Sequence, residues 1–168
     1  MKKTIFTLVV GLAFAGPAFA QIGQGTVLIG ASSNLNYSST SFDGADDNLN
    51  SFNINLGVGY FVIENLALGI ELGYDKITFG DNDASSTTFG LFGRYYVNGK
   101  IFLGAGYRSS KGEDSDAVNS LPLEVGYAAF ITDNIAVEPS FGYALGLGDN
   151  ESNTFGLNVG FSLYLNRQ

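Results

Sequence analysis

Residues 60–74 read YFVIENLALGIELGY, and related versions of this pattern follow at residues 95–107 (YYVNGKIFLGAGY) and 129–143 (AFITDNIAVEPSFGY). Each version has an aromatic residue, a short polar turn, a segment in which apolar residues alternate with small or polar ones, and a closing Gly-Tyr pair. The versions begin 35 and 34 residues apart. Similarity at a nearly fixed period indicates a repeated supersecondary unit, and the composition of this unit is typical of a β-hairpin.

The same period-two alternation occurs in eight segments, and after Gln21 no segment carries a helical period. The predicted strands are residues 26–37, 51–60, 66–74, 87–96, 100–108, 120–130, 135–143 and 153–165. One face of each strand carries large apolar residues, and the other carries glycine, small polar residues and a few charges. In the third strand, Leu66, Leu68, Ile70, Leu72 and Tyr74 alternate with Ala67, Gly69, Glu71 and Gly73.

This distribution differs from that of a soluble β-sandwich, which packs large side chains inside and exposes charged ones. Here the second face is too small and too polar to form the surface of a soluble protein, and too sparse to form a conventional core. The pattern therefore indicates an inside-out barrel, with the apolar face toward lipid and the small face toward a narrow interior.

The connections between the strands alternate in length. Short connections are centred on residues 62–65, 97–99 and 131–134. Longer ones, rich in Asp, Ser, Asn and Gly, occupy residues 38–50, 75–86, 109–119 and 144–152. The predicted fold is therefore all-β: an eight-stranded antiparallel up-and-down transmembrane β-barrel with short periplasmic turns, longer extracellular loops and both termini on the turn side.

Seven of the nine tyrosines fall at the ends of the apolar faces. Tyr60, Tyr95 and Tyr127 precede the short turns, and Tyr37, Tyr74, Tyr107 and Tyr143 lie where strands meet the long loops. Leu66 to Tyr74 in a tilted strand spans roughly 20 Å, close to the height of the apolar band in such barrels. Two aromatic girdles at the membrane interfaces are predicted, although a general preference of aromatic residues for hairpin ends also explains the pattern.

The first twenty residues read MKKTIFTLVVGLAFAGPAFA. Two lysines, a short apolar run and Ala18-Phe19-Ala20 are typical of a secretory signal cleaved after Ala20, and the run from Ile5 to Ala15 is too short to span a bilayer as a helix. We expect residues 1–20 to be a signal peptide and residues 21–168 to form one barrel domain.

Charge and composition exclude several classes of function. Removing Lys2 and Lys3 leaves six basic residues against sixteen acidic ones, a formal net charge of −10, which makes nucleic acid an unsuitable partner. The chain has no Cys and no His. Ser-His and Cys-His nucleophiles and disulfides are therefore impossible, and the commonest neutral zinc ligand is absent. We expect no cofactor.

The leader, hairpins such as FVIENLALGIELGY and the last strand TFGLNVGFSLYL resemble the small eight-stranded outer-membrane β-barrels of the OmpA/OmpX type, often grouped as porin-like outer-membrane proteins. The resemblance implies a bacterial outer-membrane location, contact with outer-membrane lipid and lipopolysaccharide, and folding by the barrel-assembly machinery. That machinery commonly recognises a terminal aromatic residue, whereas Tyr164 is followed here by LNRQ. Phe161 or Tyr164 serves that role, or recognition differs.

Alternate positions along a strand point to opposite faces, and this rule places five charged residues on the inward faces: Glu71, Arg94, Arg108, Glu124 and Glu138. A buried charge is costly unless it is paired, so these residues are expected to form an internal ion-pair network. The network acts either as a gate in a narrow pore or as a plug. We favour the plug because an eight-stranded barrel is just wide enough inside for side chains.

Ten carboxylates are predicted in the loops: Asp43, Asp46, Asp47, Asp81, Asp83, Glu113, Asp114, Asp116, Asp149 and Glu151. Such oxygen-rich segments can bind Ca²⁺ or Mg²⁺, bridging to lipopolysaccharide phosphates. GDNDAS at residues 80–85 lacks the spacing of a calcium loop, and solvated acidic loops are the simpler interpretation.

We therefore predict a non-catalytic outer-membrane barrel with a structural or surface-contact role. Outer-membrane proteases, phospholipases and lipid-A-modifying enzymes of similar size rely, as families, on histidine, which is absent here. The alternative is a narrow porin-like channel for ions or very small solutes. A secreted or periplasmic lipid-binding barrel would need large apolar residues lining its cavity, and the glycine-rich inner face argues against it.

Overall fold

The computed structural model of the protein describes residues 22–30, 33–41, 48–113, 115–148 and 152–167. The expected signal peptide lies outside these residues. The strands are β1 (Val27–Ile29), β2 (Asn34–Ser41), β3 (Asn48–Ile63), β4 (Leu66–Phe79), β5 (Asn82–Val97), β6 (Ile101–Gly112), β7 (Val118–Tyr127), β8 (Ala129–Phe130), β9 (Ile135–Leu147) and β10 (Thr154–Leu165). The described residues contain no helix long and apolar enough to cross a membrane.

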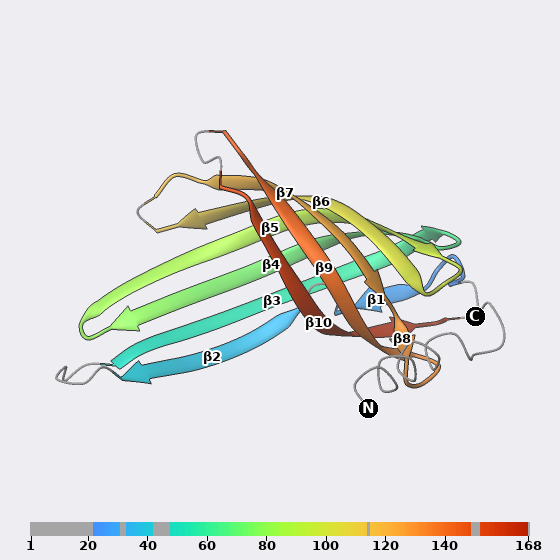
Figure 1. Ribbon diagram of the computed structural model, residues 1–168, viewed down its shortest axis with the longest axis horizontal. Helices are drawn as coiled ribbons and strands as arrows, with labels where there is room; N and C mark the ends of the chain where they lie inside the picture. Colours follow the sequence, from blue (N-terminus) through green and yellow to red (C-terminus); the bar gives the residue numbers. More distant parts are fainter. Residues whose placement is uncertain (1–21, 31–32, 42–47, 114, 149–151, 168) are drawn as a thin grey trace, which may run out of the picture.

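The strands form one antiparallel sheet in which neighbours along the chain are also neighbours in space (Figure 1). β1 and β2 together make the first strand of the wall, and β7 and β8 together make the sixth, so the ten elements form eight strands. β1 pairs with β10 on one side and with β3 on the other, which closes the sheet into a barrel. The predicted eight-stranded up-and-down barrel is confirmed.

Both ends of the described chain are attached to the short-turn end of the barrel. Ile22 N–H donates to Asn65 Oδ1 (3.1 Å), and Asn65 N–H donates to the Ile22 carbonyl (3.0 Å). At the other terminus, Arg167 Nη1 donates to the Asp133 carbonyl (2.8 Å). These contacts place the last described residues beside the β3–β4 and β8–β9 turns.

Several predicted strand boundaries were wrong. The segment 75–86 is not a long loop, because β4 and β5 continue as a paired hairpin to Phe79 and Asn82 and leave only Gly80 and Asp81 in the turn. Strand pairing uses backbone groups, so the polar residues of this segment continue the ladder, and the exposed apolar residues Ile77 and Phe79 extend it beyond Tyr74. β3, β6 and β9 also extend beyond their predicted ends.

The first strand, predicted to be continuous over residues 26–37, is interrupted after Ile29. Gly30 has φ of +105°, a conformation that L-residues with a side chain rarely adopt. Ser33 Oγ accepts a hydrogen bond from Gly57 N–H (2.9 Å) in place of a ladder contact. The β3 register shifts across this point, from Ile29 opposite Val58 to Asn34 opposite Asn55, so the first strand contains two residues more than β3.

The outer face of the barrel is apolar and exposed, the reverse of a soluble protein. Along β4, Leu68, Ile70 and Leu72 are exposed whereas Ala67 and Glu71 are buried. Equivalent exposed residues occur on β3, β5, β6, β7, β9 and β10. Burying this surface in hydrocarbon is favourable, so the described wall is suited to lipid.

The inner face alternates large side chains with glycine across the strands. Phe92 of β5 lies opposite Gly69 of β4 on one side and Gly106 of β6 on the other. A Cβ atom built at Gly69 would overlap both the Phe92 ring and the Val58 carbonyl oxygen. Glycine therefore provides the space that each large inward side chain needs in a narrow interior.

The turn end of the interior is packed with aromatic residues. Phe61, Tyr96, Phe102 and Tyr164 have no solvent exposure. The Tyr96 ring centroid lies 5.5 Å from that of Phe61 and 5.6 Å from that of Phe102, and Tyr164 packs edge-on against Tyr96 at 6.2 Å. We call these four residues the aromatic floor. Ile22, Leu28, Ala67, Ala128 and Ala136 are fully buried in the same cluster.

The Gly69–Phe92 contact gives a direct test of this packing. We expect Gly69→Ala to lower the free energy of unfolding by about 1–3 kcal/mol, because the added methyl group meets the Phe92 ring and the strand backbone. Gly156→Ala is the matched control, since a Cβ there has no heavy atom within 4 Å. Urea unfolding in lipid vesicles measures both variants, and equal midpoints would contradict the packing argument.

Candidate functional site: the interior ion pairs

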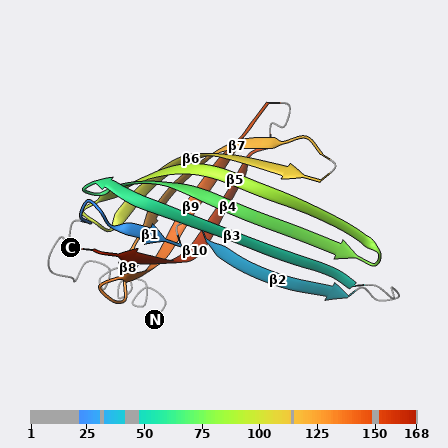
Figure 2. The same ribbon diagram turned by 180° about the vertical axis from the view of Figure 1, so that it is seen from behind.

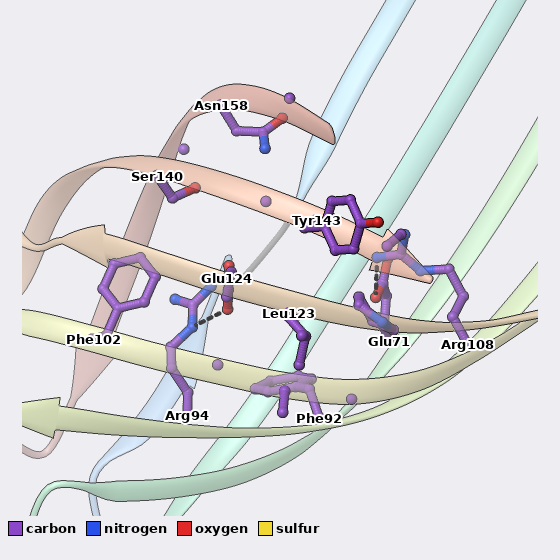
Figure 3. A pocket seen from close by; sticks show the side chains of 18 of the residues that line it. Glu71, Phe92, Arg94, Phe102, Arg108, Leu123, Glu124, Ser140, Tyr143 and Asn158 are labelled. Carbon is purple, nitrogen blue, oxygen red and sulfur yellow. Dashed lines mark hydrogen bonds and ion pairs between the residues drawn. The ribbon is translucent and has the colours of Figure 1, made fainter. Parts of the chain in front are cut away.

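The five inward-facing charges lie in the interior as two separate groups, and Figure 3 labels four of them: Arg94, Glu124, Arg108 and Glu71. In the first, Arg94 of β5 bonds two carboxylates: its Nε donates to Glu124 Oε1 and its Nη1 to Glu138 Oε2, each at 2.7 Å. Arg94 is only 2% exposed and Glu138 only 4%. A buried guanidinium is costly unless carboxylates are bonded to it, and Glu124 of β7 and Glu138 of β9 supply these carboxylates.

Two tyrosine hydroxyls complete the first group. Tyr164 OH donates to Glu138 Oε1 and lies 3.0 Å from Tyr96 OH. Arg94 Nη1 also approaches Tyr96 OH at 3.3 Å, and its guanidinium lies 4.2 Å from the centroid of the Phe102 ring. The ion pairs and the aromatic floor are therefore one connected structure.

The second group is a single ion pair closer to the loop end. Arg108 Nη2 of β6 donates to both Glu71 oxygens, at 2.9 and 2.8 Å. Glu71 is buried, whereas about a third of the Arg108 side chain is exposed. Arg108 Nε is buried and has no hydrogen-bond partner. This group therefore retains one unused donor.

A cavity of about 360 Å³ lies in the barrel interior and is lined by both groups. In Figure 3, Arg94 and Glu124 point toward one another at one side of it, and Arg108 and Glu71 do so at the other. Phe92, Phe102, Ser140 and Asn158 also line it. The cavity is thus an interior chamber with mixed polar and apolar walls, of the size of small ligand pockets.

Alternation placed the charges on the inner face, but it did not identify Tyr164 as a partner of Glu138 or Tyr96 as a partner of Arg94. Both tyrosines alternate with the apolar face in their strands, which was the available signal. The pairs connect residues 30 to 44 positions apart in the sequence. Their identity depends on strand stagger around the barrel, which alternation alone does not give.

The seven tyrosines predicted as girdles differ in exposure. Tyr37, Tyr60, Tyr74, Tyr95 and Tyr107 are exposed on the outer surface. Tyr127 and Tyr143 are only partly exposed, and Tyr143 also lines the interior cavity. Tyr107 OH donates to Asn119 Oδ1 on the neighbouring strand (2.9 Å), so its polar end has a partner at the loop side.

Four of the ten predicted loop carboxylates lie in the described residues: Asp81, Asp83, Glu113 and Asp116, all exposed. The other six, Asp43, Asp46, Asp47, Asp114, Asp149 and Glu151, lie outside them. Asp83 contacts Lys76 Nζ at 2.6 Å, and this hydrogen bond lowers the pKa of Asp83 and raises the pKa of Lys76. Within the part of the chain that the structure describes, no three acidic side chains form a metal-binding group.

The sequence matches a family described as "Outer membrane protein beta-barrel domain" over residues 6–162. The chain belongs to this family. It is a small eight-stranded β-barrel protein of the bacterial outer membrane. A search of curated proteins found no match.

Two solved structures share the fold. The outer membrane protein Ail of Yersinia pestis, determined in a phospholipid bilayer nanodisc, has a TM-score of 0.53 and 15% identity, with 85% of this chain and 99% of Ail covered. A chain from the de novo design of transmembrane β-barrels has a TM-score of 0.51 and 14% identity, with 86% and 99% covered. At these identities the likeness concerns fold alone.

The Arg94 group predicts a large effect of a single substitution. We expect Arg94→Met to lower the free energy of unfolding by about 3–5 kcal/mol, because Glu124 and Glu138 lose their cationic partner inside the barrel. Lys76→Met is the matched control, since its ion pair with Asp83 is exposed to solvent and its loss should barely change stability. Urea unfolding in vesicles measures both, and similar midpoints would contradict this energetic role.

Proposed function

We propose that this outer-membrane barrel is non-catalytic, does not conduct solutes, and acts through its structural presence in the membrane and its acidic extracellular side. The observation that carries the proposal is the aromatic floor. Phe61, Tyr96, Phe102 and Tyr164 are fully buried at the turn end, and Tyr96 OH contacts Arg94 of the first group of ion pairs. A solute entering the cavity from the loop end meets this packed layer.

The interior charges also favour a structural role over catalysis. A general acid or base needs an accessible proton and a position beside a substrate. Arg94 and Glu138 are instead buried and bonded to each other, and Glu71 accepts two hydrogen bonds from Arg108. The absence of histidine from the whole chain removes the commonest acid–base residue.

The extracellular side supports a role in surface contact. Paired strands reach beyond the tyrosines of the loop-side girdle, as in the β4–β5 hairpin, which ends at Gly80 and Asp81. Asp81, Asp83, Glu113 and Asp116 give this side exposed negative charge. We propose that it contacts lipopolysaccharide, with divalent cations bridging carboxylates and phosphates, or a further extracellular ligand.

Assembly by the barrel-assembly machinery is part of the same proposal. Phe161 projects from the outer face of β10 and is exposed, whereas Tyr164 is buried and bonded to Glu138. Phe161 is therefore the better candidate for the aromatic residue that the machinery recognises near the end of this chain.

Single-channel recording in planar bilayers tests the closed interior. We expect the refolded protein, first shown to be folded by its heat-dependent migration on a gel, to give no discrete conductance steps. Steps in the wild type that change in amplitude in Glu124→Gln would instead support the alternative, a narrow channel for ions or very small solutes.

A further inference from the structure

The extracellular part of the β4–β5 hairpin carries apolar residues on its inner face. β4 pairs with β5 from Leu66 to Phe79 without a register shift, so the alternation of its two faces is unbroken. Ile77 and Phe79 therefore lie on the same face as the buried Glu71, and opposite to the face of Tyr74. Figures 1 and 2 show this hairpin, in green, projecting at the end of the barrel away from β1 and β8.

The neighbouring strands widen this apolar surface. Leu49 of β3 lies directly opposite Phe79, and Ala84 of β5 lies directly opposite Ile77. Ile77 is 49% exposed and Phe79 is 42% exposed, although both are on the inner face. We call Leu49, Ile77, Phe79 and Ala84 the rim patch.

The rim patch lies outside the hydrocarbon layer. Phe79 follows Tyr74 of the loop-side girdle by five residues, which is about 16 Å along a strand. The inner face between this patch and the ion pairs is polar, since Asn53 Nδ2 donates to Asp75 Oδ1 there. Apolar side chains that are exposed to water above a polar belt are typical of an interaction surface.

Charge is divided between the two faces of this extension. The two described lysines at the extracellular end, Lys76 of β4 and Lys111 of β6, are both on the outer face. Within the described residues, the inner face beyond the Arg108–Glu71 pair carries Asp75 and no cation. The inner side of the extension is therefore apolar and negative.

The order of side chains along β4 defines what this surface fits. Asp75, Ile77 and Phe79 are alternate residues on the inner face, and Asp81 follows in the exposed turn. Two acidic residues thus bracket two apolar ones. A complementary partner has apolar side chains flanked by cationic ones.

We propose that the rim patch binds a cationic amphipathic peptide. Its aliphatic or aromatic side chains pack on Ile77 and Phe79, and its lysine or arginine side chains bond Asp75 and Asp81. A neutral sugar gains nothing from these carboxylates, and an anionic one is repelled by them unless divalent cations intervene. This inference rests on the proposed surface-contact role of the extracellular side and names a partner for it.

Fluorescence anisotropy tests peptide binding to the full protein in phosphatidylcholine nanodiscs. The probe is a short fluorescent peptide with phenylalanine and leucine between flanking lysines. We expect saturable binding that exceeds binding to empty nanodiscs and weakens with added salt. A matched peptide with glutamate in place of lysine should not bind. Equal signals from empty and protein-containing nanodiscs, or equal binding of a peptide with serine in place of the apolar residues, would overturn the proposal.

Variants on the two faces of the hairpin locate the site. Ile77→Ser/Phe79→Ser should weaken peptide binding about tenfold or more, because both apolar contacts are lost, whereas Thr78→Ser on the outer face should not. Asp81→Asn should weaken it about twofold to fivefold, whereas Glu113→Gln should not, because the Glu113 carboxylate is bonded on the outer face of β5. Heat-dependent migration on a gel verifies that each variant is folded.

The outcomes separate this inference from the proposed function. Equal affinity of wild type and Ile77→Ser/Phe79→Ser would overturn the rim patch as the binding site. The closed, structural barrel is tested independently, since it fails only if discrete conductance steps occur in planar bilayers. A protein that neither binds the peptide nor conducts would overturn this inference alone.

Discussion

The requirement that backbone N–H and C=O groups be paired inside a membrane determines this structure. Hydrocarbon offers no hydrogen-bond partner, so a β-sheet can cross it only when its first and last strands pair and close the sheet. The eight antiparallel strands are joined into a ring here because β1 pairs with both β10 and β3. The closed ring then decides where side chains go, since each strand has one face toward lipid and one toward the interior.

The small radius of an eight-stranded barrel explains the composition of the inner face. Phe92 can lie inside only because Gly69 and Gly106 flank it, and Glu71 lies between Gly57 and Gly90 for the same reason. Charges that are buried there must be neutralised, and the wall itself supplies the partners: Arg94 reaches Glu124 and Glu138 across the interior. The acidic residues at the extracellular end remain in water, so their charges need no bonded cation.

Much of this fold could be predicted from alternation alone. Period two in segments such as Leu66–Tyr74 identified the strands, and the size difference between the faces identified which side meets lipid. Parity also placed Glu71, Arg94 and Glu138 inside. It could not assign their partners, because the Arg94–Glu138 contact depends on stagger between strands that are distant in sequence.

Strand ends were missed where polar residues continue the ladder, as at Lys76 and Asp83. The interruption at Gly30 was missed because the alternation of the sequence continues through Ala31 and Leu35.

The most direct measurement is the lipid accessibility of successive positions along β4. Because the chain has no cysteine, single cysteines at Ala67, Leu68, Ile70, Glu71 and Leu72 can each carry a spin label in the protein refolded in vesicles. Collisions with oxygen report lipid, and collisions with a water-soluble nickel complex report water. An inside-out barrel predicts high oxygen accessibility at Leu68, Ile70 and Leu72 and low values at Ala67 and Glu71. The absence of this alternation, or the reverse order, would contradict the account.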